Sequence, residues 1–153
     1  MSEFASGTTV SASRSRDEIE NLLMKYGACS FAYMRDEGII HIAFRFKNLN
    51  VRMKVTIPAR DDKRFTVTPT GRRRTGDSSG LYEQEVCRRW RCLTAVIKAK
   101  LVAVTDGVAT FEQEFLPYLV TSTGETMGER LLPAVIAAKT SGQLLLTADG
   151  GQL

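Results

Sequence analysis

The side chains best suited to bind a ligand in this sequence are arginines and lysines that gather in three stretches of the chain. Guanidinium and ammonium groups donate charge-assisted hydrogen bonds to phosphate oxygens, and a local concentration of them attracts polyanions without specifying which one. The pattern therefore predicts a phosphate-binding surface, with nucleic acid as the ligand. The members of the three groups are Arg45, Arg52 and Lys54; Arg72, Arg73 and Arg74; and Arg88, Arg91 and Lys98.

The overall charge is moderate and unevenly distributed. The chain of 153 residues has 21 basic and 17 acidic side chains and a formal net charge of +4. The excess lies in the first half, because residues 1–80 sum to +5 and residues 81–153 to −1. A solubilising surface is the alternative explanation of these charges, and the count alone does not choose between the two.

Residues for catalysis or metal binding are few. His41 is the only histidine, so multi-histidine metal sites and histidine-based triads lack their components. Gly76–Gly80 reads Gly-Asp-Ser-Ser-Gly, as around the nucleophile of trypsin-like proteases, but those enzymes need two β-barrels that place a histidine. Asp106, Glu112 and Glu114 offer oxygens that Mg²⁺ prefers, at a spacing that helix caps explain better. We therefore expect neither enzyme activity nor a cofactor. A Mg²⁺-dependent nuclease is the third candidate function, after the two binding functions described below.

The first helix is predicted near the N-terminus. Ser15 and Glu18 have the spacing of a capping box, and apolar residues at helical spacing follow them. Gly27 is a typical helix stop. Residues 16–26 are therefore predicted to form a helix.

Three segments then alternate apolar and polar residues with the period of two that is typical of strands. Short turns join them, so we expect an antiparallel meander with one apolar and one polar face. A short hairpin turn at residues 48–50 would bring Arg45 and Arg52 close to opposite each other on the polar face. Their repulsion would then need a phosphate, water or an acidic side chain to offset it. The predicted strands are residues 29–34, 40–46 and 51–57.

A basic loop and a long helix follow the predicted strands. Residues 58–80 have no apolar period and contain the three consecutive arginines, so a long mobile loop is predicted. Residues 81–105 have an apolar stripe at helical spacing that includes Trp90, and this stripe is expected to pack on the sheet. Trp90 is therefore predicted to be a core residue rather than a platform for stacking bases.

Two shorter helices complete a predicted α+β fold, in which a three-stranded antiparallel meander packs against the long amphipathic helix. They are expected at residues 110–116 and from residue 126 to about 138, each beginning with a capping Thr. Pro133 is expected to kink or split the second of them. The predicted organisation is a disordered tail at 1–14, a single domain at 15–140 that includes the basic loop, and a second tail at 141–153.

The sequence is typical of a soluble protein in a reducing compartment. No apolar run approaches the roughly 20 residues that a membrane span needs, and the N-terminal residues are polar where a signal peptide is apolar. The 3 cysteines form no CxxC pair and are odd in number. We therefore expect a cytoplasmic protein without a membrane partner.

The predicted order of one helix, three strands and one helix is similar to that of double-stranded-RNA-binding domains. Gly38–His41, followed by Phe44 and Phe46, resembles that family's Gly-Pro-x-His loop and the strand after it, without the proline. Lys98-Ala99-Lys100 lies deep in the predicted long helix, whereas the family's basic motif begins that helix. This resemblance implies a similar order of helices and strands along the chain, as a topological analogy.

Four segments carry a second resemblance: Phe31–Met34, Arg89–Arg91, Ile97–Leu101 and Thr110–Leu116. In them the chain resembles short uncharacterised proteins encoded by tailed phages and prophages, over most of residues 15–138. That family has no assigned catalytic residues. The resemblance implies a phage accessory protein in the cytoplasm of the host cell, where such proteins commonly act in DNA metabolism, transcription or host defence.

The sequence as a whole predicts a phage-encoded, non-catalytic nucleic-acid-binding accessory protein. It should contact the phosphate backbone with little sequence preference and lose affinity steeply with salt. The alternative is a protein–protein inhibitor of a host nucleic-acid-targeting defence system, an anti-CRISPR-like role. In that role the basic loop would occupy an acidic groove, or Asp36 and Glu37 would imitate phosphates. The expected partner is thus nucleic acid or a host nucleoprotein complex, and a homodimer is compatible with so small a core.

Overall fold

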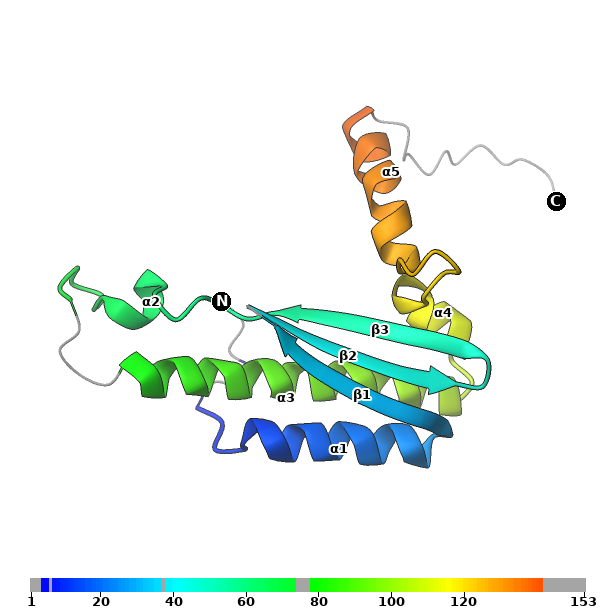
Figure 1. Cartoon of the computed structure of the whole chain (residues 1–153), viewed down its shortest axis with the longest axis horizontal. Coiled ribbons are helices and arrows are strands. Elements are labelled where there is room, and N and C mark those ends of the chain that lie inside the picture. The colour runs from blue at the N-terminus through cyan, green and yellow to red at the C-terminus, as the bar shows by residue number, and fades with distance from the viewer. Residues whose placement is uncertain (1–3, 6, 37, 74–77, 142–153) are drawn as a thin grey trace.

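The computed structural model describes residues 4–5, 7–36, 38–73 and 78–141, which form an α+β fold (Figure 1). The predicted fold class is confirmed, since a three-stranded antiparallel sheet accompanies a long helix and several shorter ones. The elements are α1 (Ala12–Lys25), β1 (Ala28–Asp36), β2 (Ile39–Phe46), β3 (Leu49–Thr56), α2 (Lys63–Thr66), α3 (Ser78–Thr105), α4 (Phe111–Phe115), the 3₁₀ helix η1 (Leu116–Tyr118) and α5 (Met127–Ser141).

The sheet has the predicted alternation of faces. β1, β2 and β3 are antiparallel neighbours in sequence order, and one face is apolar and buried while the other is polar. The turn between β2 and β3 comes earlier than predicted, because Phe46 pairs with Leu49 and only Lys47 and Asn48 lie between them. Lys47 accommodates this tight turn with a positive φ of 51°. The buried face consists mainly of Ile40, Ile42, Phe44, Val51 and Met53.

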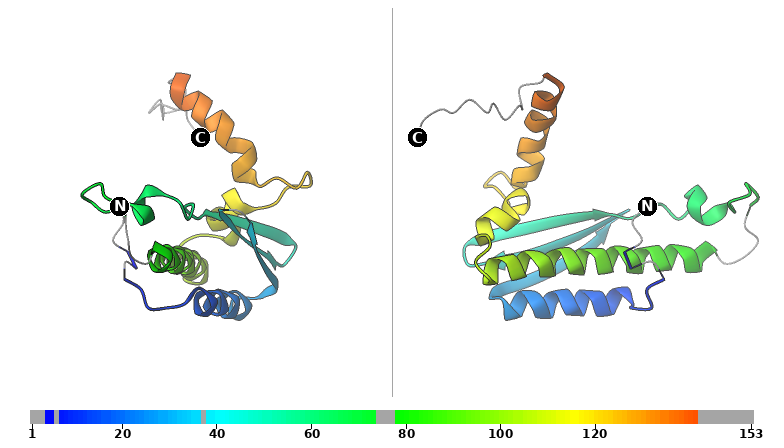
Figure 2. Two further views of the ribbon diagram at one scale, coloured as in Figure 1. Left: turned by 60° about the vertical axis from the view of Figure 1, so that its left-hand side comes forward. Right: turned by 180° about the vertical axis from the view of Figure 1, so that it is seen from behind.

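The helices α1 and α3 lie side by side against the apolar face, so the polar face of the sheet is turned away from both (Figures 1 and 2). The predicted stripe of α3 is the side that packs on the sheet. Trp90 is only 3% exposed, which confirms its place in the core, and its ring lies edge-on to Tyr33 with centroids 6.1 Å apart. The buried residues of this stripe are Val86, Trp90, Leu93, Ile97 and Leu101.

The first helix begins earlier than predicted. Ser11 is its N-cap and accepts a hydrogen bond from the backbone N–H of Arg14, so residues 12–14 belong to the helix rather than to a tail. The predicted cap, Ser15, lies inside the helix and is completely buried. Its backbone carbonyl faces Thr94 of α3 at 3.5 Å, so Ser15 is a small residue where two helices pack closely. The capping box predicted from Ser15 and Glu18 is therefore wrong.

The predicted loop at 58–80 has regular structure over part of its length. It contains α2, which Asp62 caps by accepting a hydrogen bond from the N–H of Arg64. After α2, Val67 and Arg73 form an antiparallel bridge that closes a tight hairpin. The helix α3 begins at Ser78, earlier than predicted. Local capping and turn residues, rather than an apolar period, build this segment, which is why the period-based prediction missed it.

The C-terminal helices differ in how they are placed. The predicted capping box of Thr110 and Gln113 is confirmed, and α4 packs Phe111 against Phe46 at the hairpin end of the sheet, with centroids 4.1 Å apart. The helix α5, in contrast, projects from the body (Figures 1 and 2). It continues through Pro133 to Ser141, so the proline does not split it. No helix in the described ranges is long and apolar enough to cross a bilayer.

Candidate nucleic-acid interface

The first predicted basic group lies on the polar face of the sheet. The strand register pairs Arg45 with Asn50 and Ala43 with Arg52, so the two arginines are diagonal neighbours rather than opposite each other. The cause is the two-residue turn, which places Arg52 two positions past Asn50, the residue that faces Arg45. The like-charge repulsion expected across the ladder is correspondingly weaker.

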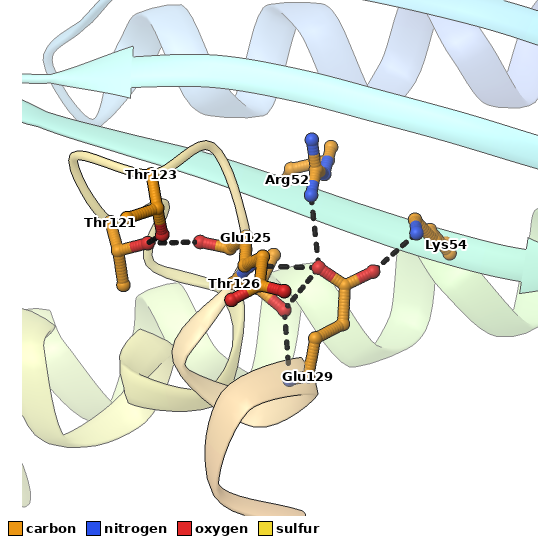
Figure 3. Close-up of polar contacts among 7 residues, drawn as sticks. All are labelled: Arg52, Lys54, Thr121, Thr123, Glu125, Thr126 and Glu129. Atoms are coloured by element: carbon orange, nitrogen blue, oxygen red, sulfur yellow. Dashed lines mark hydrogen bonds and ion pairs between the residues drawn. The ribbon is translucent and has the colours of Figure 1, made fainter.

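Arg52 and Lys54 are both bound by one carboxylate, that of Glu129 at the base of α5 (Figure 3). An Arg52 guanidinium N–H donates to Glu129 Oε2 at 2.9 Å, and the Lys54 ammonium donates to the other carboxylate oxygen. Glu129 also accepts from the backbone N–H of Thr126, at 2.8 Å, in the capping box that begins α5. One side chain therefore caps α5 and joins it to β3.

The charge of Glu129 is stabilised by all of these donors. The hydrogen bond from Lys54 is the largest cause, followed by those from the backbone of Thr126 and from Arg52, and together they lower the pKa of Glu129 from 4.5 to about 2. Glu129 is thus an anion at any physiological pH. Since it offsets Arg52 and Lys54, the polar face of the sheet is a weaker phosphate-binding surface than the sequence suggested.

Arg45 is exposed, and its Nε donates to the Cys29 sulfur at 3.1 Å on the neighbouring strand. The strands also carry an open hollow of about 340 Å³, which is lined by Ala32, Ala43, His41 and Lys54 among others. Among the residues that the structure describes, no group of three or more histidine, cysteine or acidic side chains could hold a metal ion. The hollow therefore offers apolar contact beside cationic side chains.

The predicted group on α3 lies on the other side of the sheet, and two of its three members are paired. Arg88 donates two hydrogen bonds to Glu85, at 2.6 and 2.7 Å, and both side chains are only 15% exposed. These bonds from Arg88 are the largest cause of the lowered pKa of Glu85. Arg91 forms an ion pair with Glu18 of α1, whereas Lys98 is exposed. Arg88 and Arg91 thus stabilise contacts within α3 and between α3 and α1, and the α3 group does not merge with the cations of the sheet.

The second predicted group remains available to a ligand. Residues 58–73, which we call the basic arm, contain α2 and the hairpin at Thr68–Arg73. Arg72 and Arg73 are both exposed, and no carboxylate within the described ranges pairs with either of them. Arg74, predicted as the third member, lies outside the described residues.

The tip of the basic arm is held by its own hydrogen bonds. The backbone N–H of Thr68 donates to the carbonyl of Arg72 at 2.8 Å, and the N–H of Arg72 returns a bond to the Thr68 hydroxyl at 3.2 Å. Gly71 turns the chain between them with a positive φ of 80°, a conformation that glycine adopts readily. The two arginines are therefore presented on a defined turn.

The base of the arm is attached to the body through an aromatic contact. Phe65 of α2 is buried, and its ring meets that of Tyr82 of α3 edge-on with centroids 5.8 Å apart. Arg60 adds an ion pair to Glu83 at 3.0 Å, and the Tyr82 hydroxyl accepts from Arg35 of β1 at 2.8 Å. The arm thus lies over the N-terminal part of α3 (Figure 1).

The sequence predicted the cations but not the acidic side chains that bind several of them. Glu85, three residues before Arg88 and four before Arg89, was recognisable as a helical ion-pair partner from spacing alone. Glu18 and Glu129 are distant in sequence from the cations that they bind, so spacing carries no signal for those pairs.

Comparisons with known proteins add no relative: no family model, no curated protein and no solved structure matches the chain. The side chains and their geometry are therefore the only basis for assigning a function.

Proposed function

We propose that this protein is a non-catalytic nucleic-acid-binding protein whose main phosphate contacts come from the basic arm. The observation that supports this most is that Arg72 and Arg73 are exposed and unpaired, among the described residues, on a hydrogen-bonded turn. Within the arm, Arg60, Lys63, Arg64, Arg72 and Arg73 face only two acidic residues, Asp61 and Asp62. The arm is therefore a positive projection whose ligand is expected to be a polyanion.

The arm accounts for fewer phosphate contacts than the nine predicted cations would make. Arg64 donates hydrogen bonds to Asp62, which lowers the pKa of Asp62 to about 2. Asp62 therefore stays charged and offsets the charge of Arg64. Two or three phosphates per arm correspond to a slope of log Kobs against log salt of about −2 to −3. Without side chains that reach base edges in a groove, we expect little sequence preference.

Equilibrium binding at several salt concentrations tests this proposal. Fluorescence anisotropy with labelled double-stranded DNA, single-stranded DNA and double-stranded RNA of about 20 nucleotides should show the salt slope between about 50 and 200 mM NaCl. Arg72→Ala/Arg73→Ala should weaken binding by about tenfold or more at the lowest salt and reduce the slope by about 2.

The matched control removes two exposed cations elsewhere. Lys25→Ala/Lys98→Ala changes the net charge equally, and neither lysine lies on the basic arm. It should leave the affinity and the slope nearly unchanged. Binding that does not depend on salt, or equal losses in the two double variants, would contradict a contact made by the arm.

A second candidate is an inhibitor that docks on a protein, the anti-CRISPR-like role predicted as the alternative. The internal hydrogen bonds of the Thr68–Arg73 turn support it, because a turn of fixed shape can complement a shaped acidic groove on a protein. Both candidates are proposed for a host cell, the setting that the resemblance to phage proteins implies. Capture of partners from host lysate, with and without nuclease, separates them: partners lost on nuclease treatment favour nucleic acid, and partners retained favour a protein target.

A further inference from the structure

The basic arm has no exposed aromatic ring. Single-stranded nucleic acid is bound without sequence preference by aromatic side chains on which successive bases stack, together with cations along the backbone. Phe65 is the only aromatic residue of the arm, and it is 6% exposed because it packs edge-on against Tyr82 of α3, which is equally buried. The arm therefore offers cations without a platform for stacking bases.

The half-exposed ring of Tyr33 on β1 does not supply that platform. The Arg16 guanidinium lies over this ring, 4.3 Å from its centroid, and the Trp90 ring meets it edge-on. The Tyr33 ring is thus part of the contact between α1, β1 and α3.

The two exposed arginines of the arm lie on opposite sides of its tip. Arg73 pairs with Val67 in an antiparallel bridge. The carbonyl of Arg72 accepts from the N–H of Thr68 at 2.8 Å. The two arginines are thus consecutive residues of an extended segment, in which successive side chains point to opposite sides. Phosphates that bind both guanidinium groups must therefore lie on both sides of the tip.

We propose, on the basis of the proposed function, that the ligand of the arm is double-stranded nucleic acid. The Thr68–Arg73 turn lies in a groove, and one arginine is directed at each of the two phosphate backbones that border it. The grooves of B-DNA are about 6 Å and about 12 Å wide, and the wider one admits a two-stranded β-ribbon. A single strand has one backbone, so it meets only one of the two arginines at a time.

The tip of the arm suits a stiff ligand and does not read its sequence. The backbone of the tip is fixed by its own hydrogen bonds, and a DNA duplex has a persistence length of about 50 nm, so neither partner loses much conformational freedom on binding. The hydroxyls of Thr68 and Thr70 are hydrogen-bonded to each other at 2.9 Å, and Pro69 between them has no N–H. The tip therefore directs cations at the two backbones and few polar groups at base edges.

Binding of matched duplexes and strands tests the proposal. Fluorescence anisotropy of the whole protein, at about 100 mM NaCl, compares a DNA duplex, an RNA duplex and each of their strands alone. One additional phosphate contact corresponds to about tenfold in affinity at this salt concentration, so at least one duplex should bind about tenfold more tightly than its own strands. The duplex with the larger difference identifies the backbones as those of DNA or RNA. Equal affinity for both duplexes and their strands overturns the proposal.

Single substitutions separate the two arginines. Arg72→Ala and Arg73→Ala should each weaken duplex binding by about tenfold, because each removes one of two simultaneous phosphate contacts. Strand binding should change little in either variant, since the remaining arginine takes the place of the lost one. Equal losses for duplex and strand would mean that both arginines contact one backbone, which overturns the arrangement.

A substitution in the turn tests its geometry at constant charge. Gly71 has a φ of 80° and donates its N–H to the Thr68 carbonyl at 2.9 Å. Proline has no N–H and a φ of about −65°, so Gly71→Pro should distort the turn and lower the duplex affinity towards that of the strands, with strand affinity unchanged. Gly124→Pro is the matched control, because Gly124 has a φ of 84° and donates to the Thr121 carbonyl at 3.0 Å in a turn outside the arm. A duplex preference that survives Gly71→Pro, or is lost equally in Gly124→Pro, overturns the proposed geometry.

The same measurements distinguish this proposal from the proposed function. Binding that depends on Arg72 and Arg73 but is equal for duplexes and strands keeps the arm as a nucleic-acid contact and removes only the duplex. Absence of salt-dependent binding to every probe removes both.

Discussion

At the scale of single residues, Ser15 shows how a local pattern can be overridden by packing. Its spacing to Glu18 is that of a capping box, but Ser11 caps the helix instead and Ser15 faces α3. The Ser15 hydroxyl is buried without a hydrogen-bond partner among the described residues. A small side chain is needed at this close contact, and the hydroxyl itself contributes nothing favourable.

Ser15→Ala should therefore stabilise the protein. Removal of a buried, unpaired hydroxyl relieves a desolvation cost, and we expect the free energy of unfolding to rise by about 1 kcal/mol. Urea denaturation followed by circular dichroism measures the change. Ser13→Ala, on the exposed side of the same helix, is the control for helix propensity and should have a smaller effect. A loss of stability in Ser15→Ala would mean that the hydroxyl has a partner.

Glu129 gives a residue-scale prediction about pH. Its folded pKa, about 2, lies below the ordinary 4.5, so its contribution to stability is fully present above pH 4.5 and is lost as the pH falls towards 2. The junction between α5 and β3 should loosen over that window. Carboxyl NMR of selectively labelled protein should show the Glu129 midpoint near 2, and Lys54→Ala should raise it because Lys54 is the largest cause of the shift. A midpoint near 4.5 in the unchanged chain would contradict the junction.

At the scale of elements, the basic arm is attached to the body mainly by Phe65 on Tyr82. Phe65→Ala should detach the arm while α3 and the sheet persist. Truncation of a buried phenylalanine costs about 3–5 kcal/mol, and we expect that loss to be concentrated in residues 58–73. Hydrogen exchange by mass spectrometry should show faster exchange there, with Leu132→Ala on exposed α5 as control. Uniformly faster exchange across the core would show that the arm is part of the main folding unit.

The elements also show what sequence could and could not predict. Strands and the long helix follow from apolar periods, and the period correctly placed Trp90 in the core. The arm has no such period, because α2 is a single turn held by the Asp62 cap and the hairpin depends on Gly71. That α5 projects could not be predicted either, since its sequence contains enough apolar residues for a core helix. The contact between Gly128 and Pro117 and the ion pairs of Glu129 with β3 hold its base, and both come from residues distant in sequence.

At the scale of the whole molecule, the sheet separates the cations that the sequence had grouped together. The polar face holds Arg52 and Lys54 beside Glu129, while the cations of α3 lie on the helical side. A one-dimensional count of charge contains no information about which side of a sheet a residue occupies. The candidate interface is therefore limited to the arm, which lies at the end of the molecule opposite α4 (Figure 1).

The segment that follows η1 also affects how the sheet can meet other strands. Val51 of β3 is bridged to Leu119, and the N–H of Val120 donates to the carbonyl of Asn50 at 2.8 Å. Backbone groups at this end of an outer strand are thereby already occupied within the chain, and a strand from a neighbouring molecule cannot add there. Release of that segment would turn this edge into a template for β-sheet aggregation, so the few residues after η1 protect the solubility of the protein in concentrated solution.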